Sequence, residues 1–134
     1  MSDTNRSRCP ISCALDLVGD KWSLLVLRDI LFFGKRYYHE FAVSDEGIST
    51  NILADRLLKL ETNDLLTKQR DSANKKKFIY APTEKSLDLL PAILEIILWA
   101  DKHAPNSDAP KSTITKIKKN RAAFIKSIRS QFKD

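Results

Sequence analysis

Glycine, proline and cysteine are scarce in this chain of 134 residues, which holds only 3 Gly, 5 Pro and 2 Cys. So few turn-forming residues disfavour an all-β fold and nearly exclude a Rossmann-type or barrel enzyme. Two cysteines cannot build a scaffold of several disulfides. The length suits one domain, and Leu, Ile, Lys and Ala at helical spacings predict a mainly helical one.

Signals of catalysis, metal binding and membrane insertion are also missing. The sequence has no glycine-rich phosphate loop, no HExxH and no nucleophile elbow, and the spacing of Cys9, Cys13, His39 and His103 matches no zinc pattern. No apolar run reaches the roughly 20 residues of a membrane span, and polar residues 1–8 lack the apolar core of a signal peptide. We expect a cytoplasmic protein that is not an enzyme and needs no metal or cofactor.

Acidic residues are rare near the C-terminus. Residues 105–134 carry 8 Lys and Arg against Asp108 and Asp134, whereas residues 1–104 hold 15 residues of each sign. The net charge of +6 therefore belongs to the tail. The net positive charge alone is weak evidence for nucleic-acid binding, so that inference has to rest on where the charged residues lie in the fold.

Apolar periodicity and capping residues predict the order of the elements. Pro10 opens a first helix, Asp20 caps a second that is apolar on most faces, and Ser49 caps a fourth after the turn at Gly47. The expected elements are helices over 10–18, 21–33, 37–43 and 50–62, strands over 65–70 and 77–81, and a long helix from Thr83 to about 103. Pro91 either kinks that long helix or marks a helix start.

This order of helices followed by a hairpin is typical of a winged helix-turn-helix domain, so the fold class is mainly α with a small β-hairpin. The helix from Thr50 would enter the major groove of DNA, and the hairpin would be the wing. The expected base contacts are Ser49, Thr50, Asn51, Ala54 and Asp55. The expected backbone contacts are Arg36, His39, Lys59, Lys68, Arg70, Lys75, Lys76 and Lys77. Asp55 would accept from a cytosine amino group or pair with Arg56 or Lys59.

The long helix has apolar residues in nearly every direction, more than one small domain can cover. We expect it to pack on its own core along one side and on a second subunit along another, in a two-fold dimer. We place a polar extension over 1–8, the winged domain over 9–104, a linker over 105–110 and a basic amphipathic helix over 111–134. That last helix would add a dimer or DNA contact, cap the long helix, or bind a membrane surface.

Several short motifs follow one another in a specific order over residues 9–103. They are Cys9-Pro10, Gly19-Asp20-Lys21-Trp22-Ser23, Arg36-Tyr37, Glu40-Phe41, Gly47-Ile48-Ser49, the series Leu53, Leu57 and Leu60-Glu61, then Asp64-Leu65-Leu66, Tyr80 before Thr83, Leu90-Pro91 and Trp99. This set resembles the HxlR-type winged-helix transcriptional regulators. The chain departs from that pattern in lacking a glycine after Thr83, in a wing without prolines, and in Leu58 at a commonly basic position.

The resemblance implies a homodimeric DNA-binding regulator that acts on a two-fold operator. It also implies pairing through the first helix and the long C-terminal one. The expected interface residues are Ile11, Leu15, Leu90, Ile93, Leu94, Ile97 and Trp99. The alternative is a protein-interaction adaptor that keeps the winged-helix scaffold without specific DNA binding.

Cys9 stands where the positive end of a helix dipole favours the reactive thiolate. Relatives with a cysteine here resemble sensors of oxidants or electrophiles, so we expect possible redox sensing by Cys9 and Cys13. The competing interpretation is a buried structural thiol. Cys13 lies four residues on, near the edge of disulfide range on one helix, and could resolve an oxidised Cys9 only if the helix frays. A bond between subunits, Cys9 to Cys9 or Cys9 to Cys13, also stays open.

Overall fold

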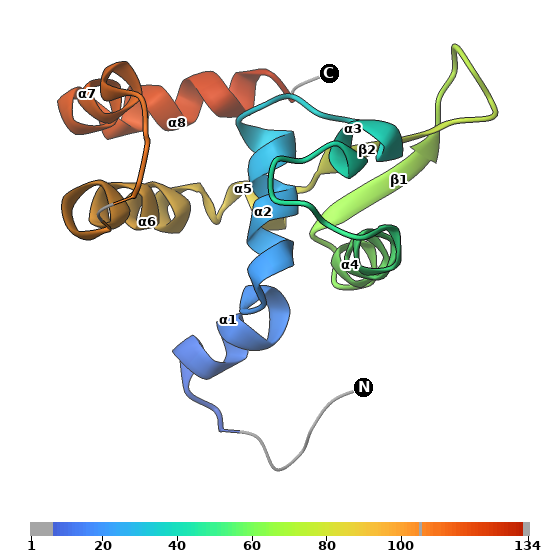
Figure 1. Ribbon diagram of the computed structural model, residues 1–134, viewed down its shortest axis with the longest axis horizontal. Helices are drawn as coiled ribbons and strands as arrows, with labels where there is room; N and C mark the ends of the chain where they lie inside the picture. Colours follow the sequence, from blue (N-terminus) through green and yellow to red (C-terminus); the bar gives the residue numbers. More distant parts are fainter. Residues whose placement is uncertain (1–6, 105, 133–134) are drawn as a thin grey trace. The chain divides into compact units, whose positions relative to one another are not determined.

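The computed structural model describes residues 7–104 and 106–132, and within them the chain forms helices and one two-stranded hairpin (Figure 1). Most of the 1–8 extension and Pro105 of the linker lie outside these residues. The chain divides into two compact units between Ala81 and Pro82, at the end of the hairpin. No described helix is both long enough and apolar enough to cross a membrane.

The first unit contains the winged-helix elements in the predicted order. Its helices are α1 (Pro10–Val18), α2 (Lys21–Leu31), α3 (Tyr38–Ala42) and α4 (Thr50–Thr62), and its strands are β1 (Leu66–Arg70) and β2 (Phe78–Pro82). Helix α4 contacts α2, α3 and β1, and α1 contacts α2. The unit is thus built around α4, and the mainly helical winged fold is confirmed.

The core of the first unit consists of one apolar face from each element. Leu53, Leu57 and Leu60 recur at helical spacing on α4 and are buried, which leaves the opposite face of the helix to solvent. Phe41 of α3 packs edge to face on Tyr80 of β2, with ring centroids 5.9 Å apart. This packing holds the short helix α3 against the hairpin.

A tight turn and a capping serine set the start of α4. Gly47 has φ +71°, a conformation that residues with a Cβ rarely adopt, and its N–H donates to the Ser44 carbonyl at 3.1 Å. The Ser49 hydroxyl then accepts from the N–H of Ile52 at 3.2 Å. At the other end Asp64 has φ +62° and turns the chain into β1. The helix therefore occupies the residues that the sequence predicts.

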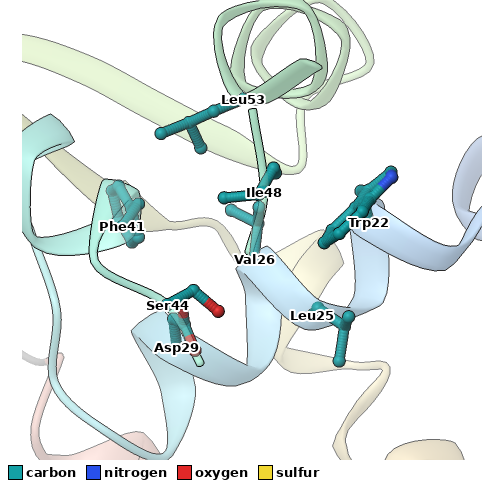
Figure 2. A pocket seen from close by; sticks show the side chains of 8 residues that line it. All are labelled: Trp22, Leu25, Val26, Asp29, Phe41, Ser44, Ile48 and Leu53. Atoms are coloured by element: carbon teal, nitrogen blue, oxygen red, sulfur yellow. The ribbon is translucent and has the colours of Figure 1, made fainter. Parts of the chain in front are cut away.

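A small cavity lies between α2, the α3–α4 connection and α4 (Figure 2). Its volume is about 10 Å³, roughly the space of one water molecule. The side chains around it are those of Trp22, Leu25, Val26, Asp29, Phe41, Ser44, Ile48 and Leu53. This cavity is too small to hold more than a water molecule.

The second unit contains α5 (Glu84–Leu87), α6 (Leu90–His103), α7 (Lys111–Lys119) and α8 (Arg121–Ser130). Thr83 caps α5 by accepting from the Ser86 N–H, and the long helix expected from Thr83 starts afresh at Leu90-Pro91. Of the two roles left open for Pro91, the helix start is the one observed. The single helix expected over 111–134 is two helices, because Asn120 ends α7 and caps α8 through the Ala123 N–H.

Candidate nucleic-acid interface

The N-terminal end of α4 presents the side chains expected to read bases. Ser49, Thr50, Asn51, Ala54 and Asp55 are all exposed, opposite the buried leucines of the same helix. The Tyr38 hydroxyl donates to the Thr50 carbonyl at 3.2 Å and so ties the first turn of α4 to α3. Asp55 contacts the Arg56 guanidinium, which is the pairing offered above as one alternative for this carboxylate.

Helix α4 is anchored by Asp20, which also caps α2. Its carboxylate accepts from the N–H and hydroxyl of Ser23 at 3.1 and 2.6 Å, and from Arg56 Nε at 2.7 Å. Partial burial works to raise the pKa of Asp20, but the hydrogen bonds from Ser23 and Arg56 outweigh it and hold the pKa well below its usual range. Lys59 Nζ lies 3.5 Å from the same carboxylate, so this expected DNA contact already has a partner within the chain.

The tip of the hairpin presents Lys75, Lys76 and Lys77 to solvent, all three exposed. The turn is held by the Asp71 N–H donating to the Lys77 carbonyl and by the Lys77 N–H donating to the Asn74 carbonyl, each at 2.9 Å. Arg70 reaches across and donates to the Lys75 carbonyl at 2.6 Å. The three lysines thus extend from an ordered turn.

Aromatic rings lie under several cations of the wing. Lys68 Nζ and the Arg70 guanidinium lie 4.4 and 4.8 Å from the centroid of the Phe78 ring, and Lys77 Nζ lies 5.4 Å from that of Tyr37. At exposed sites such contacts stabilise by only about 0.5–1 kcal/mol, so each cation can turn to a phosphate at small cost.

A hydrogen bond joins the wing to Tyr37, the residue that precedes α3. The Tyr37 hydroxyl donates to the Asp71 carboxylate at 2.8 Å, which raises the pKa of Tyr37. The Ala73 N–H and this hydroxyl together lower the pKa of Asp71. The Tyr80 N–H also donates to the Arg36 carbonyl at 2.8 Å. The wing and the loop before α3 are therefore held together.

Arg36 and His39, both expected to contact phosphates, have different surroundings. Arg36 is half-buried and donates to the carbonyls of Ile30 and Lys35 at 3.3 and 3.0 Å, and burial lowers its pKa. His39 is exposed and stacks on the Tyr37 ring. The exposed candidates for phosphate contact are thus His39 and the wing cations.

Two grooves lie beside α4 and the wing. Their linings include two exposed side chains, Tyr38 and Leu58, that were not predicted as DNA contacts. Tyr38 faces both grooves, and Leu58 lies in the smaller one, whose volume is about 200 Å³. The larger groove has a volume of about 370 Å³, and its lining is Tyr37, Tyr38, His39, Lys68, Lys76, Lys77, Phe78 and Tyr80. In the sequence Tyr38 directly follows the Arg36-Tyr37 motif, and Leu58 occupies a position that is commonly basic in the family.

The cysteines and the expected dimer residues also have definite surroundings. Cys9 and Cys13 are exposed and not joined in a disulfide, with Cys9 at the N-cap of α1. Ile11 and Leu15 on α1 are 70% and 57% exposed, and Trp99 on α6 is 64% exposed. Leu90, Ile93 and Leu94 are buried within the single chain, and Ile97 is half-buried. Ile96, which was not predicted as an interface residue, is exposed one helical turn from Trp99 on α6.

No cluster of three or more potential metal ligands occurs among the described residues.

The helices and hairpin that carry this surface match a known family. The model of the HxlR-like helix-turn-helix family aligns with residues 17–108. The chain belongs to the HxlR-like helix-turn-helix family. It is 35% identical over 97 residues to the HTH-type transcriptional regulator Mb3122 of Mycobacterium bovis, covering 72% of this chain and 60% of that relative. The HxlR-like family is one of transcriptional regulators, not of enzymes.

A second HxlR-like relative is the transcriptional regulator YodB of Bacillus subtilis. It is 32% identical over 101 residues, which cover 75% of this chain and 89% of YodB. The structure of reduced YodB superposes with a TM-score of 0.60 at 31% identity, over 76% of this chain and 100% of that one. YodB has also been solved after diamide treatment and with bound quinone. The redox regulator HypR in its oxidised form gives a TM-score of 0.63 at 25% identity, over 75% and 100% of the two chains.

Proposed function

We propose that this chain is a sequence-specific DNA-binding transcriptional regulator that acts as a homodimer on a two-fold operator and responds to oxidants or electrophiles through Cys9. The observation that carries the DNA-binding part is the exposed N-terminal face of α4 within the same unit as an exposed cationic wing. A helix of this kind fits the major groove, whose width is roughly 12 Å, while cations beside it neutralise phosphates.

Asn51 is the residue best suited to read a base. It is exposed on the first turn of α4, and an asparagine amide can pair with adenine through two hydrogen bonds. We expect Asn51→Ala to reduce discrimination between the DNA upstream of the gene and a shuffled duplex by about 1–3 kcal/mol. Fluorescence anisotropy on both duplexes measures this difference.

The matched control for Asn51 is Asn106→Ala, which removes an exposed asparagine outside the winged-helix elements. That variant should discriminate as the unaltered chain does. Equal weakening of Asn51→Ala on both duplexes would remove this residue from base reading. A folded unaltered chain that shows no salt-dependent affinity for either duplex would favour the adaptor instead.

Exposed apolar residues on α1 and α6 support the homodimer. Ile11 and Leu15 are four residues apart on α1, and Ile96 and Trp99 are three apart on α6, so each pair lies on one helix face. A two-fold interface would remove these side chains from water. A dimer also suits a two-fold operator, because its two α4 helices could enter successive major grooves about 34–36 Å apart.

Cys9 supports the redox part of the proposal. It is exposed at the N-cap of α1, where an oxidant can reach it, and YodB and HypR have been solved in treated or oxidised forms. Diamide would take up the two electrons and two protons that a pair of thiols releases on forming a disulfide. Movement of α1 would then disturb the dimer and the spacing of the two α4 helices.

We expect diamide to weaken binding of the chain to its upstream DNA by about 5-fold to 150-fold, the usual range of coupling between two sites. Cys9→Ser should bind as the untreated chain does and should be insensitive to diamide. Cys13→Ser, the matched control, separates the possible bonds, since it permits a Cys9 to Cys9 link but not a Cys9 to Cys13 link. If Cys9→Ser loses affinity on treatment as the unaltered chain does, Cys9 is not the sensor.

A further inference from the structure

The helices α7 and α8 carry charge of one sign only. Between residues 109 and 132 the sequence has no aspartate or glutamate. The cations of the two helices are Lys111, Lys116, Lys118, Lys119, Arg121, Lys126 and Arg129. The HxlR-like family match ends at residue 108, so this basic segment is an addition to the shared domain.

The two arginines of this segment are engaged inside the second unit. Arg129 donates to Glu84 at 2.8 Å and to Asp88 at 2.6 Å, and Arg121 pairs with Glu95. These carboxylates belong to α5, its C-terminal end and α6. The arginines therefore fasten the helical pair to the rest of the unit and neutralise the acidic groups nearest to it.

The lysines are left to solvent. All five are exposed, and none of them pairs with a carboxylate in the part of the chain that the structure describes. Lys116 and Lys119 lie three residues apart on the face of α7 opposite Ile114 and Ile117, and they line a groove of about 260 Å³ with Ala123, Phe124 and Ser127 of α8. The second unit thus presents five exposed lysines that form no ion pair among the described residues.

The apolar faces of the two helices distinguish between the polyanions that such a surface could bind. A helix that lies on a membrane needs its apolar face free to enter the lipid. Here Ile114, Ile117 and Ile128 are buried, with Ile117 only 1% exposed. With these isoleucines turned inward and Phe124 and Ile125 half-buried, the exposed surface of the two helices is mainly lysine, which suits a phosphate backbone better than a bilayer.

We propose that the lysines of α7 and α8 form a second DNA contact, which binds the sugar-phosphate backbone of duplex DNA independently of base sequence. This inference rests on the DNA binding of the proposed function, but not on its sequence specificity. Each lysine that neutralises one phosphate releases counterions, so the logarithm of the affinity falls with the logarithm of the salt concentration by about 0.9 per contact.

The test is the salt dependence of binding to a shuffled duplex, between about 50 and 200 mM salt. The full chain is compared with the triple variant Lys116→Gln, Lys118→Gln and Lys119→Gln. We expect the slope of the variant to be smaller in magnitude by about 0.9 for each of these lysines that contacts a phosphate, and by about 2 per protomer if Lys116 and Lys119, which share a face, both do. The control replaces the same lysines with arginine, which retains the charge and should retain the slope. Circular dichroism checks that both variants keep their helices.

An unchanged slope in the glutamine variant, or no binding of the shuffled duplex by the unaltered chain at low salt, would overturn the proposal. A membrane would instead be the partner if the full chain binds vesicles of phosphatidylserine and phosphatidylcholine, the glutamine variant binds them less, and the salt dependence of DNA binding is the same for both. That result would also overturn the proposal. Specificity is measured separately, on the upstream DNA. If the unaltered chain does not prefer upstream DNA but the slope difference appears on the shuffled duplex, the proposed sequence specificity is wrong and the proposed lysine contact stands.

Discussion

Replacing Lys75, Lys76 and Lys77 together with alanine is expected to flatten the dependence of DNA affinity on salt. The three lysines extend from the ordered turn of the wing and are exposed, so each can neutralise one phosphate. At about 0.9 per contact, the slope of log affinity against log salt should fall in magnitude by about 3 per protomer. Affinity at low salt should fall on upstream and shuffled DNA alike, because phosphates carry no base sequence.

Anisotropy titrations over a series of salt concentrations measure the wing effect. Arginine at the same three positions keeps the charge and should keep the slope. Asn51→Ala supplies the opposite pattern, with reduced discrimination and little change of slope, because it removes a base contact and no cation. If alanine at all three positions leaves the slope unaltered, the wing does not touch the backbone.

Removing the carboxylate of Asp20 is expected to lower the free energy of unfolding by about 2–4 kcal/mol. Asp20→Ala deletes the N-cap of α2, which contributes about 1 kcal/mol. It also leaves the buried Ser23 hydroxyl without its acceptor, a loss of about 1–3 kcal/mol. Arg56 and Lys59 lose their partner at the same time, so α4 is less firmly positioned and DNA affinity should fall too.

Asp20→Asn separates the charge from the cap, because an amide oxygen can still accept from Ser23. We expect it to destabilise the chain less than alanine does, as measured by urea unfolding. Since the pKa of Asp20 is depressed in the folded state, its charge stabilises the fold above the unfolded pKa of about 3.9, and that contribution is lost as the pH falls below this value. The asparagine variant should lack this part of the acid sensitivity. Equal stability of Asp20→Ala and the unaltered chain would contradict the anchoring role.

The recognition helix α4 is the element that local sequence predicts best. Gly47, Ser49 and the spacing of Leu53, Leu57 and Leu60 are all local signals, and the helix indeed runs from Thr50 to Thr62. The same kind of signal fails at Asn120. The apolar stripe keeps its helical period from Ile117 to Phe124, so nothing in the periodicity marks the end of α7 and the start of α8.

Pairing between distant residues is beyond the reach of local patterns. Asp20 and Arg56 are separated by 36 positions, and only the packing of α2 against α4 brings them together. For this reason the sequence predicts Lys59 and Arg36 as DNA backbone contacts without showing that Lys59 lies near the Asp20 carboxylate or that Arg36 donates to backbone carbonyls. The exposed wing lysines and Asn51 need no distant partner, which is why sequence alone places them on the surface.

Helices α7 and α8 are short, so the arrangement of their lysines depends on the packing of their apolar residues. They hold 9 and 10 residues, and helices shorter than about 12–15 residues are marginal in isolation. Their regularity therefore depends on burial of Ile114, Ile117 and Ile128. We expect the amide protons of both helices to exchange with solvent in one concerted opening. A chain in which the two helices have unfolded keeps its lysines but loses the fixed spacing at which they would contact successive phosphates.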